Sequence, residues 1–452
     1  MTLLNELSAE VCQRARMSRD PRFDGRFFVA VKTTGIFCSP ICPANLPKEE
    51  NVEYFSSQAL AVSAGYRPCL RCRPESAPHS WAWKGAETTF LRALTLIEQG
   101  ELDGSLETLA SRLGISDRYL RQLFQRHLGM PPKQYAQIQQ LMFAKQLLHT
   151  SQISITEVAY ASGFQSTRRF NDAFQKLFRL TPTQVRRERA ALPSRNHLSL
   201  AFRGPFDWAH MLDFYRLRAI EGMELVDEQS YQRHFVLGEG TGWFKASMAQ
   251  SHLDIEFEME RLSDLRHLVA RLRRMFDLDA DLISIEAHLE QLAPGLVRRT
   301  GIRIPGVWNA WEAGVRAVLG QQVSVKAAIG QLNLLVSTLA ASEGSTRYFP
   351  TPEQVQMSDL SFLRMPERRK ETLKRLADYV RLHPMDSPMA WLSLSGIGPW
   401  TVDYAQLRGE SRSHCFLTGD LIVKKALAKF PQLTAESVAP WGSYATFHCW
   451  SH

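Results

Sequence analysis

The segment from about residue 85 to residue 190 has apolar residues at the three- and four-residue spacing of amphipathic helices, separated by glycine and polar turns. The pattern of residues 106–114 (Leu-x2-Leu-Ala-x2-Leu-Gly) recurs 49 residues later in residues 155–163 (Ile-x2-Val-Ala-x2-Ser-Gly). Each copy predicts a helix, a turn and a second helix. The small alanine allows the two helices to cross closely, and the glycine can adopt the backbone conformation that the turn requires. We therefore expect a duplicated helix-turn-helix unit.

The second helix of each copy is predicted to bury one face and expose the other. The buried pairs at spacing i, i+4 are Leu120 with Phe124 and Phe170 with Phe174. The outward positions carry basic or amide side chains: Arg118, Arg121, Gln122, Arg168, Arg169 and Asn171. Two such helices fit a protein that inserts them into successive major grooves of a DNA duplex, and a helical bundle with a basic surface is the alternative.

The rest of the chain has other patterns. After a polar linker near residues 190–197, residues 198–280 alternate short apolar and polar runs, which predicts a small sheet with helices. From about residue 281 the pattern is mostly helical. At about 150 residues per domain, 452 residues predict a multidomain protein, mainly α with α+β parts.

The composition is that of an ordinary globular protein, with 44% hydrophobic and 22% charged residues, which excludes a disordered or collagen-like chain. No uninterrupted apolar stretch approaches the roughly 20 residues that cross a bilayer. The first 20 residues mix charges where a secretory signal would be apolar. We expect a cytoplasmic protein without a membrane partner.

The positive charge is concentrated in one segment. The chain has 54 basic and 46 acidic residues, and residues 112–190 alone contain 13 basic and 4 acidic ones. That segment carries nine excess positive charges, so the remainder is close to neutral. A polyanionic partner such as nucleic acid follows for this segment, with a solvated basic face as the alternative.

Four of the seven cysteines have the spacing of metal ligands, Cys38-x3-Cys42 and Cys69-x2-Cys72. In a cytosolic chain this spacing indicates one tetrahedral Zn²⁺ rather than disulfides. The spacing alone leaves open whether the zinc only stabilises a small domain or also supports chemistry.

The sequences DPRFDGRFFVAVKTTGIFCSPICP and GYRPCLRCRPE, which contain these cysteines, closely resemble the N-terminal domain of Ada-type alkylation-response proteins. The resemblance covers about residues 10–75 and implies that the four cysteines hold zinc. It also implies that Cys38 irreversibly accepts a methyl group from a methylated DNA phosphate. Zinc would keep this sulfur a thiolate, which is the nucleophilic form.

The resemblance further implies a charge-based signal. Four thiolates on Zn²⁺ carry a formal charge of −2, and methylation of one leaves −1, so DNA binding should tighten. Thr34 and Arg67 match positions that contact DNA in the family. Pro43 and Asn45 stand where a well-known relative has basic residues, so two positive charges are lost.

The basic segment, ending in GFQSTRRFNDAFQKLFRLTPTQVRR, resembles the AraC-type DNA-binding domain over about residues 85–190. The resemblance implies that the predicted recognition helices contact double-stranded promoter DNA and that RNA polymerase is a partner. Which bases are recognised does not follow, because arginine binds guanine edges and phosphates alike.

A glycine hairpin is predicted in residues 394–401 (LSGIGPWT), where Gly396 and Gly398 precede a helix that begins with proline. Such a hairpin presents backbone N–H groups to a DNA phosphate, and a plain turn between helices is the alternative. Asp420 lies 22 residues beyond Gly398, in FLTGDLIVKK. A hairpin followed by an aspartate is typical of the helix-hairpin-helix glycosylase superfamily.

Within that superfamily, PGLVRRTGIRIPGVWNAWEAGVRAVLGQQVSV, LSGIGPWTVDYAQLRG and WGSYATFHCW resemble AlkA-type 3-methyladenine DNA glycosylases over about residues 198–452. The resemblance implies that Asp420 stabilises the sugar cation while an N-alkylated purine leaves, without a cofactor for this step. It implies a base pocket that includes Trp400, Tyr404 and Trp450, which could also be ordinary core aromatics.

Three positions refine this expectation. Trp400 occupies the place of the Schiff-base lysine of strand-cutting relatives, which implies a monofunctional enzyme that leaves an abasic site. Gln322 stands where the AlkA relative inserts a leucine wedge into DNA. Gly419 replaces an acidic neighbour of the catalytic aspartate. The Pro-Cys-His-Arg motif of an O6-methylguanine methyltransferase is missing, since Cys415 and Cys449 lie in HCF and HCW.

Together these features predict four domains: an Ada-type zinc domain (1–78), an AraC-type double helix-turn-helix domain (79–190), an AlkA-type α+β subdomain (198–280) and a helix-hairpin-helix glycosylase domain (281–452). We expect a monomeric bacterial protein associated with the nucleoid. The alternatives are a transcription factor whose glycosylase-like half only binds DNA, and a repair enzyme whose zinc domain is purely structural.

Overall fold

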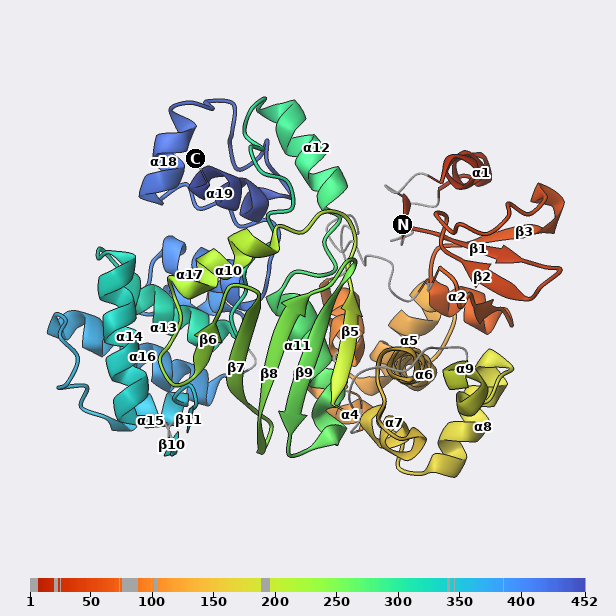
Figure 1. Cartoon of the computed structure of the whole chain (residues 1–452), viewed down its shortest axis with the longest axis horizontal. Coiled ribbons are helices and arrows are strands. Elements are labelled where there is room, and N and C mark those ends of the chain that lie inside the picture. Colours follow the sequence, from red (N-terminus) through yellow and green to blue (C-terminus); the bar gives the residue numbers. More distant parts are fainter. Residues whose placement is uncertain are drawn as a thin grey trace. The chain divides into compact units, whose positions relative to one another are not determined.

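The computed structural model divides into two compact units, each built from two segments of the chain (Figure 1). The first unit comprises Met1–Ser199 and Arg261–Ala270, and the second comprises Leu200–Glu260 and Arg271–His452. The structure describes residues 7–19, 23–24, 26–72, 74, 88–98, 100, 102, 105–187, 196–339, 342–344, 346–384 and 386–451.

The first unit begins with a small sheet of strand order β3-β1-β2-β4. β1 pairs antiparallel with β2 and β3, and β2 pairs in parallel with β4. Phe28, Val29 and Ala30 of β1 and Phe37 of β2 are all buried, so both faces of β1 are covered. The elements of this part are α1 (Ala9–Ser18), β1 (Phe28–Val31), β2 (Ile36–Cys38), η2 (Glu49–Asn51), β3 (Val52–Phe55), α2 (Gln58–Ser63) and β4 (Arg67–Pro68).

Helices form the remainder of the first unit, and the predicted duplication is confirmed. The helices are α3 (Thr88–Glu98), α4 (Leu106–Arg112), α5 (Asp117–Leu128), α6 (Pro132–Thr150), α7 (Ile155–Ala161), α8 (Thr167–Phe178) and α9 (Pro182–Arg187). The turns between α4 and α5 and between α7 and α8 contain Gly114 and Gly163, at φ +68° and +87°. Ser116 and Ser166 then cap α5 and α8 through their side chains.

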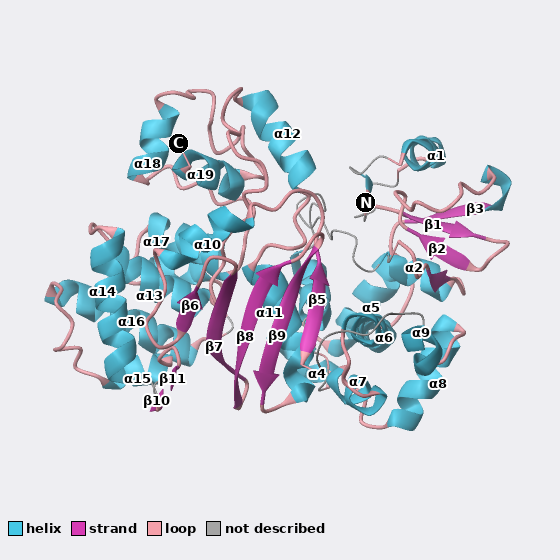
Figure 2. Cartoon of the chain, viewed as in Figure 1, coloured by secondary structure: helices cyan, strands magenta, loops and turns pink. Residues whose placement is uncertain are grey.

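The second unit contains the small sheet that the alternating pattern predicts, with strand order β5-β9-β8-β7-β6 (Figure 2). Its strands are β6 (Glu224–Val226), β7 (Ser230–Leu237), β8 (Gly240–Met248), β9 (His252–Met259) and β5 (His197–Ala201), of which β5 begins in the first unit and ends in the second. Phe244 lies opposite Arg233 on one neighbouring strand and opposite Phe257 on the other, and all three side chains are buried. One face of the sheet is therefore a core face.

Helices dominate the rest of the second unit, as expected from residue 281 onward (Figure 2). Its other elements are α10 (Trp208–Arg216), α12 (Leu282–Leu292), α13 (Ala310–Gly320), α14 (Val325–Leu339), β10 (Ser342–Glu343), β11 (Thr346–Arg347), α15 (Pro352–Met357), α16 (Glu367–Leu382), η6 (Pro388–Ser393), α17 (Pro399–Gly409), α18 (Leu421–Leu427) and α19 (Gly442–Trp450). The short helix η5 (Leu262–Asp264) belongs to the first unit, and α11 (Leu265–Met275) begins in the first unit and ends in the second.

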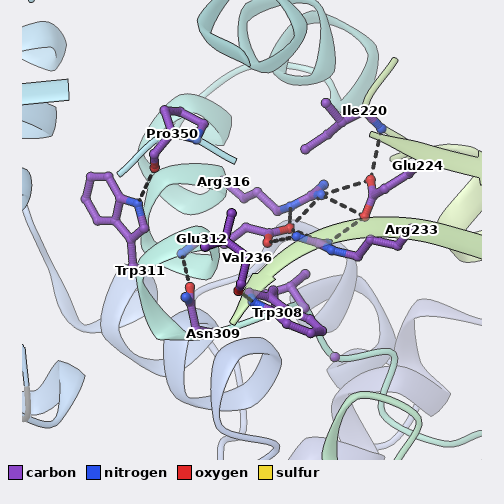
Figure 3. A network of polar contacts seen from close by, with 12 residues as sticks. Ile220, Glu224, Arg233, Val236, Trp308, Asn309, Trp311, Glu312, Arg316 and Pro350 are labelled. Atoms are coloured by element: carbon purple, nitrogen blue, oxygen red, sulfur yellow. Dashed lines mark hydrogen bonds and ion pairs between the residues drawn. The ribbon is translucent and has the colours of Figure 1, made fainter. Parts of the chain in front are cut away.

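A buried ionic network joins the sheet to α13 (Figure 3). Arg233 on β7 contacts Glu312 at 2.5 Å and Glu224 at 2.8 Å, and Arg316 contacts the same two carboxylates at 2.8 and 3.1 Å. All four side chains are at most 6% exposed. Each charge is paired and hydrogen-bonded, which is the condition for burying it without a large penalty.

In the part of the chain that the structure describes, no helix combines the length and the apolar character needed to cross a membrane.

Candidate functional sites

The four cysteines predicted to bind zinc come together in the first unit. Cys38 ends β2, and Cys69 follows β4, whose parallel pairing with β2 brings the two cysteines side by side. The backbone N–H of Cys69 donates to the carbonyl of Phe37 at 2.9 Å. The sulfurs of Cys38, Cys42, Cys69 and Cys72 all lie within 4.8 Å of one another, and none forms a disulfide.

This arrangement fits the expected metal. Sulfurs at 2.3 Å from a tetrahedral Zn²⁺ are about 3.8 Å apart, which is compatible with the observed spacing. Cys42 and Cys69 are buried, whereas Cys38 and Cys72 are half-buried. The neighbouring Ser39 donates its backbone N–H to the Cys72 sulfur at 3.4 Å and its hydroxyl to the buried Asp24. The loop around Cys38 is therefore held from two sides.

The two expected DNA contacts of this domain lie next to each other. Thr34 is exposed in the turn between β1 and β2, and Arg67 begins β4. The backbone N–H of Arg67 donates to the carbonyl of Gly35 at 2.8 Å, which fixes the two segments together. Pro43 and Asn45 are exposed in the loop after Cys42.

The four arginines expected on the recognition helices are all exposed. Arg118 and Arg121 lie on α5, and Arg168 and Arg169 lie on α8. The Arg121 guanidinium is 3.4 Å from the carboxylate of Asp117, an exposed pair with little energetic weight. Arg169 also lines a cleft of about 740 Å³ within the first unit.

In the second unit, a cavity of about 420 Å³ brings together all the residues expected to form the base pocket. Trp400 and Tyr404 line it from α17, Asp420 from the start of α18, and Trp450 from the end of α19. A volume of this size is typical of small-molecule sites.

Asp420 has two structural roles. It is the N-cap of α18, and its Oδ1 accepts from the backbone N–H groups of Ile422 at 2.9 Å and Val423 at 3.2 Å. Oδ1 also accepts from the indole N–H of Trp450 at 3.1 Å. Oδ2 has no hydrogen-bond partner among the described residues. The same carboxylate thus caps α18 and lines the cavity.

The cavity aromatics form two stacked pairs. The rings of Trp400 and Tyr404 are 5.3 Å apart at an angle of 25°, and those of Trp450 and Phe214 are 6.3 Å apart at 13°. Such π-surfaces attract a flat cationic ring.

Sequence reasoning missed one wall of this cavity. His210, Phe214 and Arg218 recur every four residues along α10 and just beyond its end, and all three line the cavity. The Arg218 guanidinium lies 3.7 Å from the centre of the Phe214 ring. The helical spacing was visible in the sequence, but a shared helix face by itself does not indicate whether its residues line a pocket or pack elsewhere.

The predicted glycine hairpin is present between η6 and α17. Gly396 has φ +94°, and Gly398 is the N-cap of α17, with proline directly after it. Gln321 donates its side-chain amide to the Gly396 carbonyl and to the Thr401 hydroxyl, both at 3.2 Å. This bond pair connects the α13–α14 loop to the hairpin.

Gln322, the expected wedge, is exposed in the α13–α14 loop at φ +56°, and the next residue, Val323, lines the cavity. A left-handed conformation is strained for glutamine, and such strain is common at functional sites. Cys415 and Cys449 are buried, and burial raises the pKa of each thiol to about 12. Both therefore have the character of inert core cysteines.

Three family models match consecutive parts of the chain. They are the metal binding domain of Ada over residues 11–75, a helix-turn-helix domain over residues 109–188, and the AlkA N-terminal domain over residues 197–309.

Curated relatives match the whole chain or one half of it. A Mycobacterium tuberculosis protein named "Probable bifunctional transcriptional activator/DNA repair enzyme AlkA" is 34% identical over 98% of this chain and 96% of its own length. DNA-3-methyladenine glycosylase 2 of Escherichia coli is 33% identical over 56% of this chain and 96% of its own length.

The Escherichia coli protein named "Bifunctional transcriptional activator/DNA repair enzyme Ada" is 34% identical over 38% of this chain and 47% of its own length. This chain therefore spans less than half of that relative. With a full-length match to the mycobacterial protein and three matching domain families, the chain belongs to the family of bifunctional transcriptional activator/DNA repair enzymes of the AlkA and Ada type.

Proposed function

We propose that the second unit is a DNA-3-methyladenine glycosylase that hydrolyses the bond between an N-alkylated purine and its deoxyribose. The observation that carries this proposal is the convergence of Asp420, Trp400, Tyr404 and Trp450 on one cavity of about 420 Å³. The match to the Escherichia coli glycosylase over nearly its whole length supports it.

The chemistry follows from the residues. The damaged nucleotide must leave the base stack to reach the cavity, since its glycosidic bond is not accessible inside a duplex. A purine alkylated at N3 or N7 is cationic, so it stacks on the electron-rich rings of Trp400 and Trp450 and leaves readily. The Oδ2 atom of Asp420 stabilises the sugar cation that forms as the base departs.

The same residues favour hydrolysis without strand cleavage. A strand-cutting enzyme of this type forms a Schiff base through a lysine, and Trp400 at that place offers no amine. Water therefore completes the reaction and leaves an abasic site. No metal or organic cofactor is needed for this step in our proposal.

DNA binding by this unit is assigned to the hairpin and the α13–α14 loop. The backbone N–H groups near Gly396 and Gly398 would bind a phosphate at the start of α17. Gln322 would fill the gap that the extruded nucleotide leaves. This role is supported by its exposed position next to Val323, which lines the cavity.

An excision assay with the variant Asp420→Asn tests the glycosylase proposal. Asparagine still caps α18, so we expect a folded protein whose single-turnover excision of 3-methyladenine from duplex DNA falls about 100-fold or more. Asp281→Asn is the matched control, because Asp281 caps α12 and does not line the cavity. If the wild type releases no base, or if Asp420→Asn equals Asp281→Asn, the DNA-binding alternative is correct.

We further propose that Cys38 in the first unit accepts a methyl group from a DNA methylphosphotriester. The thiolate attacks the methyl carbon, a sulfur–carbon bond forms, and the carbon–oxygen bond to the phosphate breaks. Its electrons remain on the phosphate oxygen, which restores the phosphodiester anion and leaves Cys38 a thioether. Zinc held by the four cysteines would keep the sulfur deprotonated at neutral pH.

Methylation removes one negative charge beside the DNA, so the domain should bind DNA more tightly afterwards. Thr34 and Arg67 would bind the phosphates near the damaged site, and Arg118, Arg121, Arg168 and Arg169 would contact the promoter. We infer that the bound monomer then activates transcription through RNA polymerase.

Intact-mass measurement tests the sensor. Incubation of the wild type with DNA that carries a methylphosphotriester should add the mass of one methyl group, located on Cys38 by peptide mapping. Cys38→Ser should add none, and Cys12→Ser, which changes a buried cysteine outside the cluster, should behave as the wild type. An unchanged wild-type mass would mean that the zinc domain is only structural.

A further inference from the structure

The Tyr404 hydroxyl has an unusual hydrogen-bonding situation. Arg408, one helical turn further along α17, donates from Nη1 to the Tyr404 oxygen at 2.8 Å. A guanidinium has only donors, so the phenol oxygen must be the acceptor in this bond. The phenol therefore directs its own proton elsewhere.

No acceptor for that proton exists among the described residues, since no hydrogen bond is found in which Tyr404 donates. Tyr404 is half-buried, and it lines the cavity that also contains Asp420. A hydroxyl that lines a cavity and has no protein acceptor can donate its proton to a molecule bound there. The natural acceptor is a molecule in the cavity.

Positive charge surrounds the same hydroxyl. Arg408 is buried, and its guanidinium lies 5.6 Å from the centre of the Tyr404 ring. Neither Arg408 nor Arg218 forms an ion pair within the described part of the chain, whereas Arg316 is paired with Glu224 and Glu312. Burial alone would raise the pKa of Tyr404, but Arg408, Arg218 and Arg316 together lower it below its ordinary value. The phenol is thus a better acid than a free tyrosine.

We propose that Tyr404 is a catalytic residue that donates a proton to the leaving purine and thereby allows this enzyme to excise purines that carry no charge. The inference rests on the glycosylase function proposed above. It assigns a proton donor for neutral purines, whose ring nitrogens N3 or N7 are free to accept a proton.

The proton balance explains why only neutral purines need this step. When the bond between C1′ and N9 breaks, its electron pair goes to the purine. An alkylated cationic purine then leaves as a neutral molecule, whereas a neutral purine would leave as an anion. Transfer of the Tyr404 proton to the purine avoids the anion, and Arg408 and Arg218 stabilise the phenolate. Water adds to C1′ and releases its proton to solvent, from which Tyr404 is reprotonated.

The other polar groups of the cavity are less suited to this role. Asp420 accepts three N–H groups on Oδ1 and is assigned to the sugar, and arginines do not give up protons. Asp213 and His210 line the cavity from α10, and burial lowers the pKa of His210. His210 is therefore largely neutral at neutral pH and has no imidazolium proton to donate.

The test compares Tyr404→Phe with the wild-type protein on two duplex oligonucleotides, one containing hypoxanthine and the other 7-methylguanine. Hypoxanthine is a neutral purine, and 7-methylguanine is cationic in the nucleotide. Phenylalanine keeps the ring that stacks on Trp400 and removes only the hydroxyl. We expect the single-turnover rate on hypoxanthine to fall about 100-fold more than the rate on 7-methylguanine.

A pH profile gives a second readout, in which the wild type and Tyr404→Phe are compared on hypoxanthine. The wild-type rate should fall at high pH as Tyr404 loses its proton, and Tyr404→Phe should keep only the fall that loss of the substrate's own N1 proton causes in both proteins. Titration of His210 would produce a limb on the acidic side instead, because its pKa is lowered.

Equal losses on both substrates in Tyr404→Phe, or the same alkaline limb on hypoxanthine in Tyr404→Phe and in the wild type, would mean that Tyr404 only shapes the pocket. Excision of 7-methylguanine without any excision of hypoxanthine by the wild type would also overturn the inference while leaving the glycosylase proposal intact. A wild type that releases neither base would overturn both.

Discussion

The buried charges of the second unit differ in how they are compensated. Glu224, Arg233, Glu312 and Arg316 neutralise one another in the network of Figure 3. Asp277 is also buried, but its carboxylate accepts from neutral groups, the Tyr444 hydroxyl at 2.9 Å and the Ile304 N–H at 3.2 Å. A carboxylate without an ion pair of this kind keeps its proton to higher pH.

Asp277 should therefore make the stability of the protein depend on pH. Burial raises the pKa of Asp277 to about 7, although the nearby Arg303 opposes the shift. Between about pH 4 and pH 7 the folded protein holds a proton that the unfolded chain has lost, so the unfolding free energy falls as the pH rises. We expect a loss of up to roughly 4 kcal/mol over this range, which Asp277→Asn should remove.

Urea unfolding at pH 4.5 and pH 7.5 measures this effect. Asp378→Asn on the surface of α16, where Asp378 pairs with Arg381, is the control that should keep the wild-type pH dependence. If Asp277→Asn and the wild type show the same difference between the two pH values, Asp277 is not the responsible group.

At the scale of elements, the hairpin before α17 contains two glycines with different constraints. Gly396 has φ +94°, and a Cβ there would lie 2.1 Å from the Thr372 hydroxyl oxygen. Gly398 has φ −109°, and a Cβ there would meet nothing within 4 Å. Gly396 is thus required by the fold, whereas the protein by itself imposes no need for glycine at Gly398.

Alanine substitutions at the two glycines should therefore have different effects on stability and on DNA binding. Gly396→Ala should lower the unfolding free energy by at least about 1 kcal/mol, because it adds both a clash and a strained conformation. Gly398→Ala should lower the unfolding free energy by less, roughly 0.5 kcal/mol, which is the usual difference between glycine and alanine at an N-cap. It should nevertheless weaken binding to duplex DNA in anisotropy titrations, since the added methyl group would meet the phosphate. Wild-type affinity in Gly398→Ala would show that this backbone does not approach DNA closely.

The elements also show what a local pattern can predict. The duplicated helix-turn-helix was predicted from a repeat of nine residues, because the glycine turns and the i, i+4 pairs depend on near neighbours. The α10 wall of the cavity was missed, since the same helical spacing serves core packing and pocket lining. For Phe214, the stacking on Trp450 and the cavity that it shares with Asp420 distinguish the two cases.

At the scale of the molecule, the two proposed reactions use separate residues in separate compact units. Cys38 and its three partners lie in the first unit, and Asp420 with its cavity lies in the second. The structure therefore favours two reactions that do not depend on each other.

Measurement of both activities in each of the two variants tests this independence. Cys38→Ser should abolish methyl transfer and the methylation-dependent gain in DNA affinity, and it should excise 3-methyladenine at the wild-type rate. Asp420→Asn should do the reverse. Loss of both activities in either folded variant, with folding checked by circular dichroism, would show that the units depend on each other.

The sequence by itself determined the cysteine spacing, the repeated helix-turn-helix, the hairpin and its distant aspartate. These features depend on residues close together in the chain, whose geometry follows from the regular period of a helix or turn. Tertiary structure alone decided that Asp420 shares a cavity with α10, that Arg408 and Arg218 surround the Tyr404 hydroxyl, and that four buried charges join β6, β7 and α13. Such contacts join residues up to about 240 positions apart, and only the packing of the whole core brings them together.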